Sequence, residues 1–138
     1  MPAVAMLHEV DPKQAILDRV GDLEGVELFG SDMLVAIYKR PEKTKSGLIL
    51  TDTTRKEDVH QGKVGLIVKM APFCYIDEDG NKFRDISVGD WVVFRPSDGW
   101  QVTLNTLQKS ISREDVVDCR IVGEASVRMR VTDPDFIY

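Results

Sequence analysis

Apolar residues along the chain occur in short runs separated by polar turns, and this pattern predicts an all-β domain. The clearest runs cover residues 33–38, 63–70, 91–94, 100–107, 116–122 and 126–131, and a shorter one covers residues 26–29. Clusters of glycine, proline and aspartate lie between them, as expected for turns that join strands. Many short strands at this spacing are typical of an antiparallel barrel or sandwich.

The N-terminal part differs because it carries the pattern of a helix. Asp11 suits the N-cap position and Pro12 the first helical position. An apolar stripe follows at helical spacing, formed by Ile16, Val20 and Leu23. A helix this short is marginal on its own. We therefore expect it to dock, either on the chain's own barrel or on a neighbouring subunit.

A long polar segment, residues 40–62, separates two of the predicted strands and is interrupted only by Leu48, Ile49 and Leu50. Connections of this length without structure of their own are uncommon in compact domains and are usually functional or disordered. One interpretation makes the aliphatic triplet a short barrel strand inside a solvated loop. The other makes it an apolar hook on a mobile arm, buried only when a partner supplies the pocket. The pattern alone leaves both interpretations open.

Composition and charge exclude several classes of protein. The chain has 138 residues, which favours one domain. A net charge of −5 and a pI near 5.0 argue against nucleic acid as a partner, because phosphate binding needs a basic face. No apolar run approaches the roughly 18 residues of a membrane span. Residues 1–7 lack the basic start of a signal peptide, so a cytoplasmic protein is expected.

Candidate catalytic and metal-binding residues are few. His8 and His60 lie in different segments with no obvious serine or cysteine partner. Residues 77–81, Asp-Glu-Asp-Gly-Asn, resemble a calcium loop, but an EF-hand has its glycine at the sixth position and Gly80 is the fourth residue here. An Asp-Gly pair between two short strands is better explained as a hairpin turn. We therefore expect neither an enzyme nor a cofactor nor a metal site.

The two cysteines, Cys74 and Cys119, have no CxxC spacing and no companion histidine cluster. Two states remain open from the sequence: buried free thiols, which we favour, and a single disulfide between them. Neither state points to a redox or metal-binding role.

Several motifs, taken in order, resemble the GroES co-chaperonin (ten-kilodalton chaperonin) family. They are residues 32–40, the Thr-Lys-Ser-Gly of residues 44–47 with the aliphatic triplet 48–50, residues 62–64, a hairpin over 72–85, and the Val-Gly-Asp of 88–90 before the apolar strand 91–94. The similarity is good over 26–98 and looser over 116–131. It implies an irregular antiparallel β-barrel over residues 26–131 that assembles into a ring, typically of seven subunits.

The resemblance also implies roles for individual residues. The segment 40–62 would be a mobile loop in which Leu48, Ile49 and Leu50 dock into a groove of a chaperonin, with Gly47 allowing the turn before them. The hairpin over 72–85 would form the roof of the dome. Strands near 26–29 and 127–131 would pair between neighbouring subunits, which gives as interface candidates Val26, Leu28, Phe29, Val127, Met129 and Val131.

Three parts depart from the family pattern: an N-terminal extension with the helix (1–25), a longer connection over 101–113, and a C-terminal tail (132–138). Such ends suit a protein that docks on neighbours in a larger assembly, and a phage origin is one explanation for this divergent member. Two functions therefore stay open. The first is a cytoplasmic, non-enzymatic ring subunit that caps the chamber of an ATP-dependent chaperonin. The alternative is a virion decoration or cement protein that binds the major capsid protein at the capsid surface.

Overall fold

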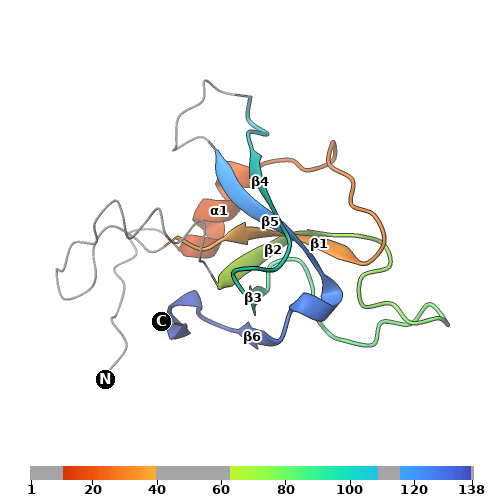
Figure 1. Ribbon diagram of the computed structural model, residues 1–138. Coiled ribbons are helices and arrows are strands. Elements are labelled where there is room, and N and C mark those ends of the chain that lie inside the picture. The colour runs from red at the N-terminus through yellow and green to blue at the C-terminus, as the bar shows by residue number, and fades with distance from the viewer. Residues whose placement is uncertain (1–10, 40–62, 109–115, 138) are drawn as a thin grey trace.

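The computed structural model describes residues 11–39, 63–108 and 116–137 of the chain (Figure 1). One helix, α1 (Pro12–Val20), precedes the strands. The strands are β1 (Asp32–Ile37), β2 (Val64–Met70), β3 (Trp91–Val93), β4 (Trp100–Leu104), β5 (Val117–Gly123) and β6 (Met129–Val131). Two short 3-10 helices complete the elements, η1 (Glu124–Ser126) between β5 and β6 and η2 (Pro134–Phe136) in the tail.

All six strands belong to one twisted antiparallel sheet with the order β4-β5-β1-β2-β3-β6, so the predicted all-β class with a short N-terminal helix is confirmed. Strand β1 lies in the centre and pairs with both β5 and β2. A register shift between Leu34 and Val35 bends the β1–β2 pair. Among the described pairings, β4 and β6 are the two edges of the sheet.

Both faces of the sheet are buried, which is why β1 and β2 are almost continuously apolar. The helix-side cluster consists of Val20, Leu28, Leu34, Ala36, Tyr38, Val64, Leu66, Val68, Ala71, Trp91, Val117 and Cys119. The hairpin-side cluster consists of Met33, Val35, Ile37, Ile67, Cys74, Tyr75, Ile86, Val92, Phe94, Val122 and Val127. Alternate residues of β1 therefore enter opposite cores.

The helix docks on its own subunit, which settles one of the two options left by the sequence. Val20 is 2% exposed, and Ile16 and Leu17 pack against the helix-side cluster. The chain leaves the helix through Gly21, which has φ +63°, a conformation that favours glycine. From the other end of the chain, Ile137 packs against the same cluster. Helix α1 and Ile137 therefore cover the same face of the sheet.

Residues 26–29 do not form the predicted strand with any described part of the chain. The ammonium of Lys69 on β2 donates to the carbonyl oxygen of Val26, at the start of this segment, and to that of Leu23, which precedes it, at 2.6 Å. Leu28 turns inward and is buried, whereas Phe29 points outward and is 73% exposed. One backbone acceptor of the segment is thus bonded to a lysine side chain.

Two other strands differ in detail from the prediction. The run 126–131 is interrupted because η1 ends at Ser126, and only Met129–Val131 pairs, with β3. The run 100–107 forms a strand only over Trp100–Leu104, and Trp100, at the start of this edge strand, is 79% exposed. An edge strand is covered from one side only, so its first residue can remain in solvent.

The hairpin over 72–85 forms with a single bridge between Ile76 and Lys82. Oδ1 of Asp77 accepts hydrogen bonds from the backbone N–H groups of Asp79 (3.0 Å) and Asn81 (2.8 Å). Gly80 has φ +83°, as a turn residue of this kind requires. The carboxylate of Asp77 therefore closes a turn, and the described residues hold no cluster suited to a metal ion.

The cysteines are free and lie on opposite faces of the sheet, so the disulfide alternative is excluded. Burial raises the pKa of the Cys74 thiol to about 11 and that of Cys119 to about 12. Both thiols are therefore protonated near neutral pH and behave as small apolar side chains.

Among the described residues, no helix has the length and apolar character needed to cross a bilayer.

Candidate partner-binding site

The predicted hook residues, Gly47, Leu48, Ile49 and Leu50, lie in segment 40–62, outside the described residues. The structure does place the residues that flank this segment, Tyr38, Lys39, Lys63 and Val64, which we call the loop stem. The backbone N–H of Tyr38 donates to the carbonyl of Val64 at 3.0 Å. Segment 40–62 therefore leaves and re-enters the fold at one point, between the ends of two adjacent antiparallel strands.

Side chains from three other elements hold the loop stem. Tyr38 is 8% exposed and packs edge-on against Trp91 of β3, with 5.7 Å between ring centroids. Its hydroxyl donates to Oδ1 of Asp135 in the tail. Lys39 forms an ion pair with Asp118 of β5, and the backbone N–H of Phe94 donates to the carbonyl of Lys63 at 2.9 Å. The base of the segment is thus a packed, bonded structure.

The hairpin over 72–85 is fixed to the sheet by Tyr75, which is 1% exposed. Tyr75 has φ +59°, an unusual conformation for an aromatic residue. Its backbone N–H donates to Oε2 of Glu124, and its hydroxyl donates to the Glu124 carbonyl at 3.1 Å. Burial raises the pKa of Tyr75 to about 12. These contacts set the direction in which the hairpin leaves the sheet.

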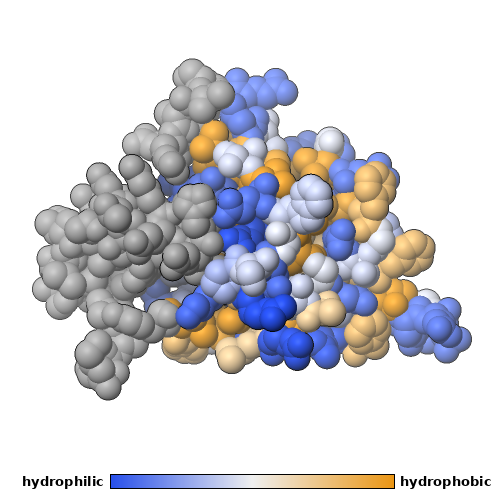
Figure 2. Space-filling model, viewed as in Figure 1, coloured by the Kyte–Doolittle hydropathy of each residue, from blue (hydrophilic) through white to orange (hydrophobic). Residues whose placement is uncertain are grey.

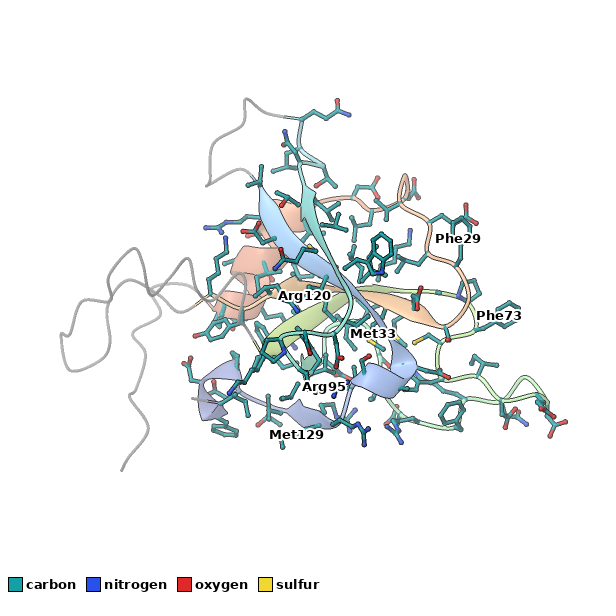
Figure 3. The ribbon with its side chains drawn as sticks, in the orientation of Figure 1. Phe29, Met33, Phe73, Arg95, Arg120 and Met129 are labelled. Atoms are coloured by element: carbon teal, nitrogen blue, oxygen red, sulfur yellow. The ribbon has the colours of Figure 1, made fainter. Side chains whose placement is uncertain are left out.

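The six interface candidates separate into two groups by exposure. Val26, Leu28 and Val131 pack against the helix-side cluster, and Val127 belongs to the hairpin-side cluster. The side chains of Phe29 and Met129 are 73% and 52% exposed. Figure 3 shows Phe29 at one end of the molecule, close to the exposed Phe73, and Met129 at a different edge. The structure therefore does not bring the two predicted strands together within one subunit.

The residues that flank Phe29 and Met129 in the sequence carry opposite charges. The segment before Phe29 presents three exposed acidic residues, Asp22, Glu24 and Glu27. Met129 lies between Arg128 and Arg130, both exposed, and Arg130 forms an ion pair with Asp90 at 3.2 Å. On the face shown in Figure 2, hydrophobic residues lie in separate patches among hydrophilic ones rather than as one continuous surface. Each of these two surfaces therefore consists of an exposed apolar side chain with charged neighbours.

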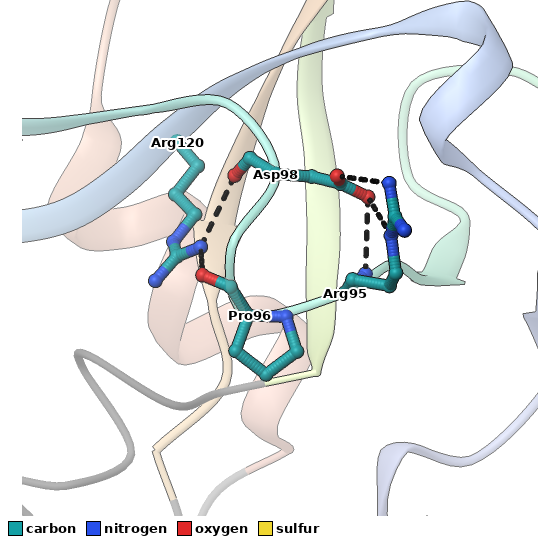
Figure 4. Close-up of polar contacts among 4 residues, drawn as sticks. All are labelled: Arg95, Pro96, Asp98 and Arg120. Carbon is teal, nitrogen blue, oxygen red and sulfur yellow. Dashed lines mark hydrogen bonds and ion pairs between the residues drawn. The ribbon is translucent and has the colours of Figure 1, made fainter.

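Arg120 is a buried charge that the sequence analysis did not identify. It lies in β5, is 3% exposed, and its Nη1 donates to the carbonyl oxygens of Pro96 and of Asp98, the latter at 3.1 Å (Figure 4). Burial lowers the pKa of its guanidinium. In the same turn, Arg95 and Asp98 form an ion pair at 3.0 Å. Arg120 thus fixes the turn that leads into edge strand β4, and no local signal in the sequence marks it.

Comparison with known proteins connects these features to one family. The model of the family described as chaperonin 10 Kd subunit matches residues 26–121. A co-chaperonin GroES from Halothermothrix orenii is 38% identical over 71 residues, covering 51% of this chain and 69% of the relative. A co-chaperonin GroES from Anoxybacillus flavithermus is 30% identical over 86 residues, covering 62% of this chain and 87% of the relative.

The matched range includes the central strands, the loop stem and the hairpin, whereas α1 and η2 lie outside it. The elements η1 and β6 also lie beyond residue 121. Residues of α1 and Ile137, which follows η2, pack against the helix-side cluster. The family model covers well over half of the chain, from before β1 into β5. The chain therefore belongs to the chaperonin 10 Kd family of co-chaperonins.

Proposed function

We propose that the chain is a ring subunit that docks on a chaperonin through segment 40–62 and caps its folding chamber during the chaperonin's ATP cycle. Membership of the co-chaperonin family carries this proposal, because the matched range 26–121 contains the whole segment and its stem. In this proposal the chain acts in the cytoplasm, binds no nucleotide and carries out no reaction itself. Its role is to bind the chaperonin and to cover the folding chamber.

The hook would be Leu48, Ile49 and Leu50, with Gly47 before it. Burying an aliphatic side chain contributes about 1.5–3 kcal/mol. Ordering each residue of an arm costs about 1–2 kcal/mol, so one arm binds weakly. Several arms on one frame gain through effective concentration, and this is why the proposal needs a ring.

The ring contact would join two different surfaces of neighbouring subunits, as closed head-to-tail assembly requires. One surface would be residues 26–29 with the exposed Phe29, and the other would be residues 127–131 with the exposed Met129. Acidic residues flank the first and arginines flank the second. This complementarity supports the pairing and would favour the correct orientation during assembly.

The virion alternative rested on chain ends that reach out to neighbours. In the structure α1 and Ile137 pack on the chain's own sheet instead. The family match and both relatives are co-chaperonins. These observations favour the chaperonin partner over a capsid protein.

The test is a double variant, Leu48→Asp with Ile49→Asp, assayed for ATP-dependent binding to a chaperonin. We expect binding to be lost while the circular dichroism spectrum and oligomer size are unchanged. Val88→Asp is a matched control, because Val88 is an apolar residue that is 53% exposed outside the segment. Negative-stain images with chaperonin and ATP should show capped ends for the parent and the control only. Intact capping by the double variant would rule out the hook.

A further inference from the structure

The C-terminal tail lies against the loop stem, although the two are far apart in the sequence. Asp135, in η2, accepts a hydrogen bond from the hydroxyl of Tyr38, 97 residues away. Pro134 is buried, and Ile137 packs against the helix-side cluster to which Tyr38 and Val64 belong. We propose that residues 133–137 form a clamp that holds the loop stem closed, with Asp135 as its positioning residue.

The tail has a defined shape of its own at this point. Oδ1 of Asp133 accepts from the backbone N–H of Asp135 at 2.9 Å, and Pro134 occupies the first position of η2. The N–H groups of Phe136 and Ile137 donate back to the carbonyls of Asp133 and Pro134. A turn closed in this way presents the Asp135 carboxylate without further ordering, so its bond to Tyr38 is preorganised.

Tyr38 is the residue through which the clamp would act. Its ring contacts Trp91 of β3, its N–H bonds to Val64 of β2, and its hydroxyl bonds to the tail. It is also the second-last described residue before segment 40–62. Releasing the hydroxyl therefore loosens the residue that joins β1, β2 and β3 at the base of this segment. Asp118 holds the next residue, Lys39, from the opposite neighbour β5.

The functional consequence rests on the proposed docking role of segment 40–62. A stem that opens adds Tyr38, Lys39 and Lys63 to the residues that a partner must order. Each added residue weakens the binding of one arm by about tenfold. The clamp would therefore raise the affinity of each arm without touching the partner. Of the two partners in this contact, Tyr38 lies inside the range matched by the family model and Asp135 lies outside it.

The clamp is tested in the full chain by amide hydrogen exchange of Asp135→Ala, which removes the acceptor, of Tyr38→Phe, which removes the donor, and of the double variant. Two amides report on the stem: Tyr38 N–H, bonded to Val64, and Phe94 N–H, bonded to Lys63. Ala71 N–H, bonded to Asp32 at the far end of the sheet, is the internal reference. We expect exchange about tenfold faster at the stem, no change at Ala71, and a double variant equal to either single one.

Equal acceleration at Ala71 would show general destabilisation, and unchanged stem exchange would show an inert tail; either result overturns the clamp. A second measurement tests its consequence: chaperonin affinity of Asp135→Ala, with exposed Glu78→Ala as the control acid. We expect at least tenfold weaker binding for Asp135→Ala only. If the parent chain binds no chaperonin, the proposed function fails, and hydrogen exchange still decides the clamp. Faster stem exchange with unchanged affinity would remove its role in binding.

Discussion

Tyr75 is bonded twice to Glu124, once through its backbone N–H to the carboxylate and once through its hydroxyl to the backbone carbonyl, at 3.1 Å. The two residues are 49 positions apart, in the hairpin and at the start of η1. Arg84 lies over the Tyr75 ring at 5.8 Å, and Phe83 contacts it edge-on. Tyr75 is therefore enclosed on several sides, and its left-handed backbone conformation is held by its surroundings.

Replacing Glu124 with alanine should leave the buried N–H of Tyr75 without its acceptor. An unsatisfied buried donor costs about 1–3 kcal/mol, so the free energy of unfolding should fall by that amount. Glu124→Gln keeps an amide oxygen in place and should cost less. Urea unfolding of the two variants measures the difference. Equal losses would mean that the charge of Glu124, and not its acceptor geometry, holds the hairpin.

Alkaline pH should destabilise the fold through three buried acids. Burial raises the pKa of Cys74 from 9.0 to about 11, that of Cys119 from 9.0 to about 12, and that of Tyr75 from 10.0 to about 12. At a pH between the unfolded-state and folded-state pKa of each group, the unfolded chain has already lost the proton that the folded chain keeps. Stability is therefore full below about pH 9 and falls as the pH rises toward about 12.

Unfolding measured at several pH values above neutrality checks this slope. A Cys74→Ala, Cys119→Ala double variant loses stability at every pH because it creates cavities, but its decline between about pH 9 and about pH 11 should be shallower than that of the parent. An identical slope in parent and variant would assign the alkaline sensitivity to other groups.

The central strands were predictable because their signal is local. The runs that became β1, β2 and β3 are almost continuously apolar, as expected for strands that are buried on both faces. The helix was predictable for a similar reason, since Asp11 and Pro12 mark its start in the sequence. The surface on which the helix docks was not predictable, because a stripe of apolar residues does not identify the surface that covers it.

Long-range polar contacts account for several features that the sequence did not predict. The carbonyl of Val26, at the start of the strand-like segment 26–29, bonds to Lys69, more than 40 positions later. Arg120 alternates with apolar neighbours as an exposed residue would, yet it is buried against the turn at Pro96. The bond between Tyr38 and Asp135 spans 97 positions. The predicted hook residues 47–50 lie outside the described residues, so their role stays a prediction.

Two glycines with similar backbone angles should respond differently to alanine. Gly99 has φ +78° and Gly80 has φ +83°. A Cβ at Gly99 would lie 2.3 Å from the carbonyl oxygen of Ile121, whereas nothing lies within 4 Å of one at Gly80. Gly80→Ala should cost about 1–2 kcal/mol for the left-handed conformation alone. Gly99→Ala should cost clearly more, since it also forces β4 away from β5.

Thermal and urea unfolding of the two variants measure these costs, and Gly80→Ala serves as the control for backbone strain. Equal losses would show that the turn at Pro96 can move away from Ile121. This would also weaken the view that Arg120 fixes the entry of edge strand β4.

Self-association should depend on charge if Phe29 and Met129 lie in complementary surfaces of neighbouring subunits. Arg128→Glu places an acid where the proposed contact supplies Glu27, so it should weaken association, by about two- to fivefold for one exposed pair. Glu27→Arg alone should have the same effect, and the two changes combined should restore association.

Arg19→Glu, a substitution at an exposed position of α1, is the matched control. Sedimentation velocity at low and high salt reads out the assembly. Because exposed pairs are screened, the rescue should be strongest at low ionic strength. Failure of the double variant to recover, with both singles folded, would mean that these charges do not face each other across the subunit contact.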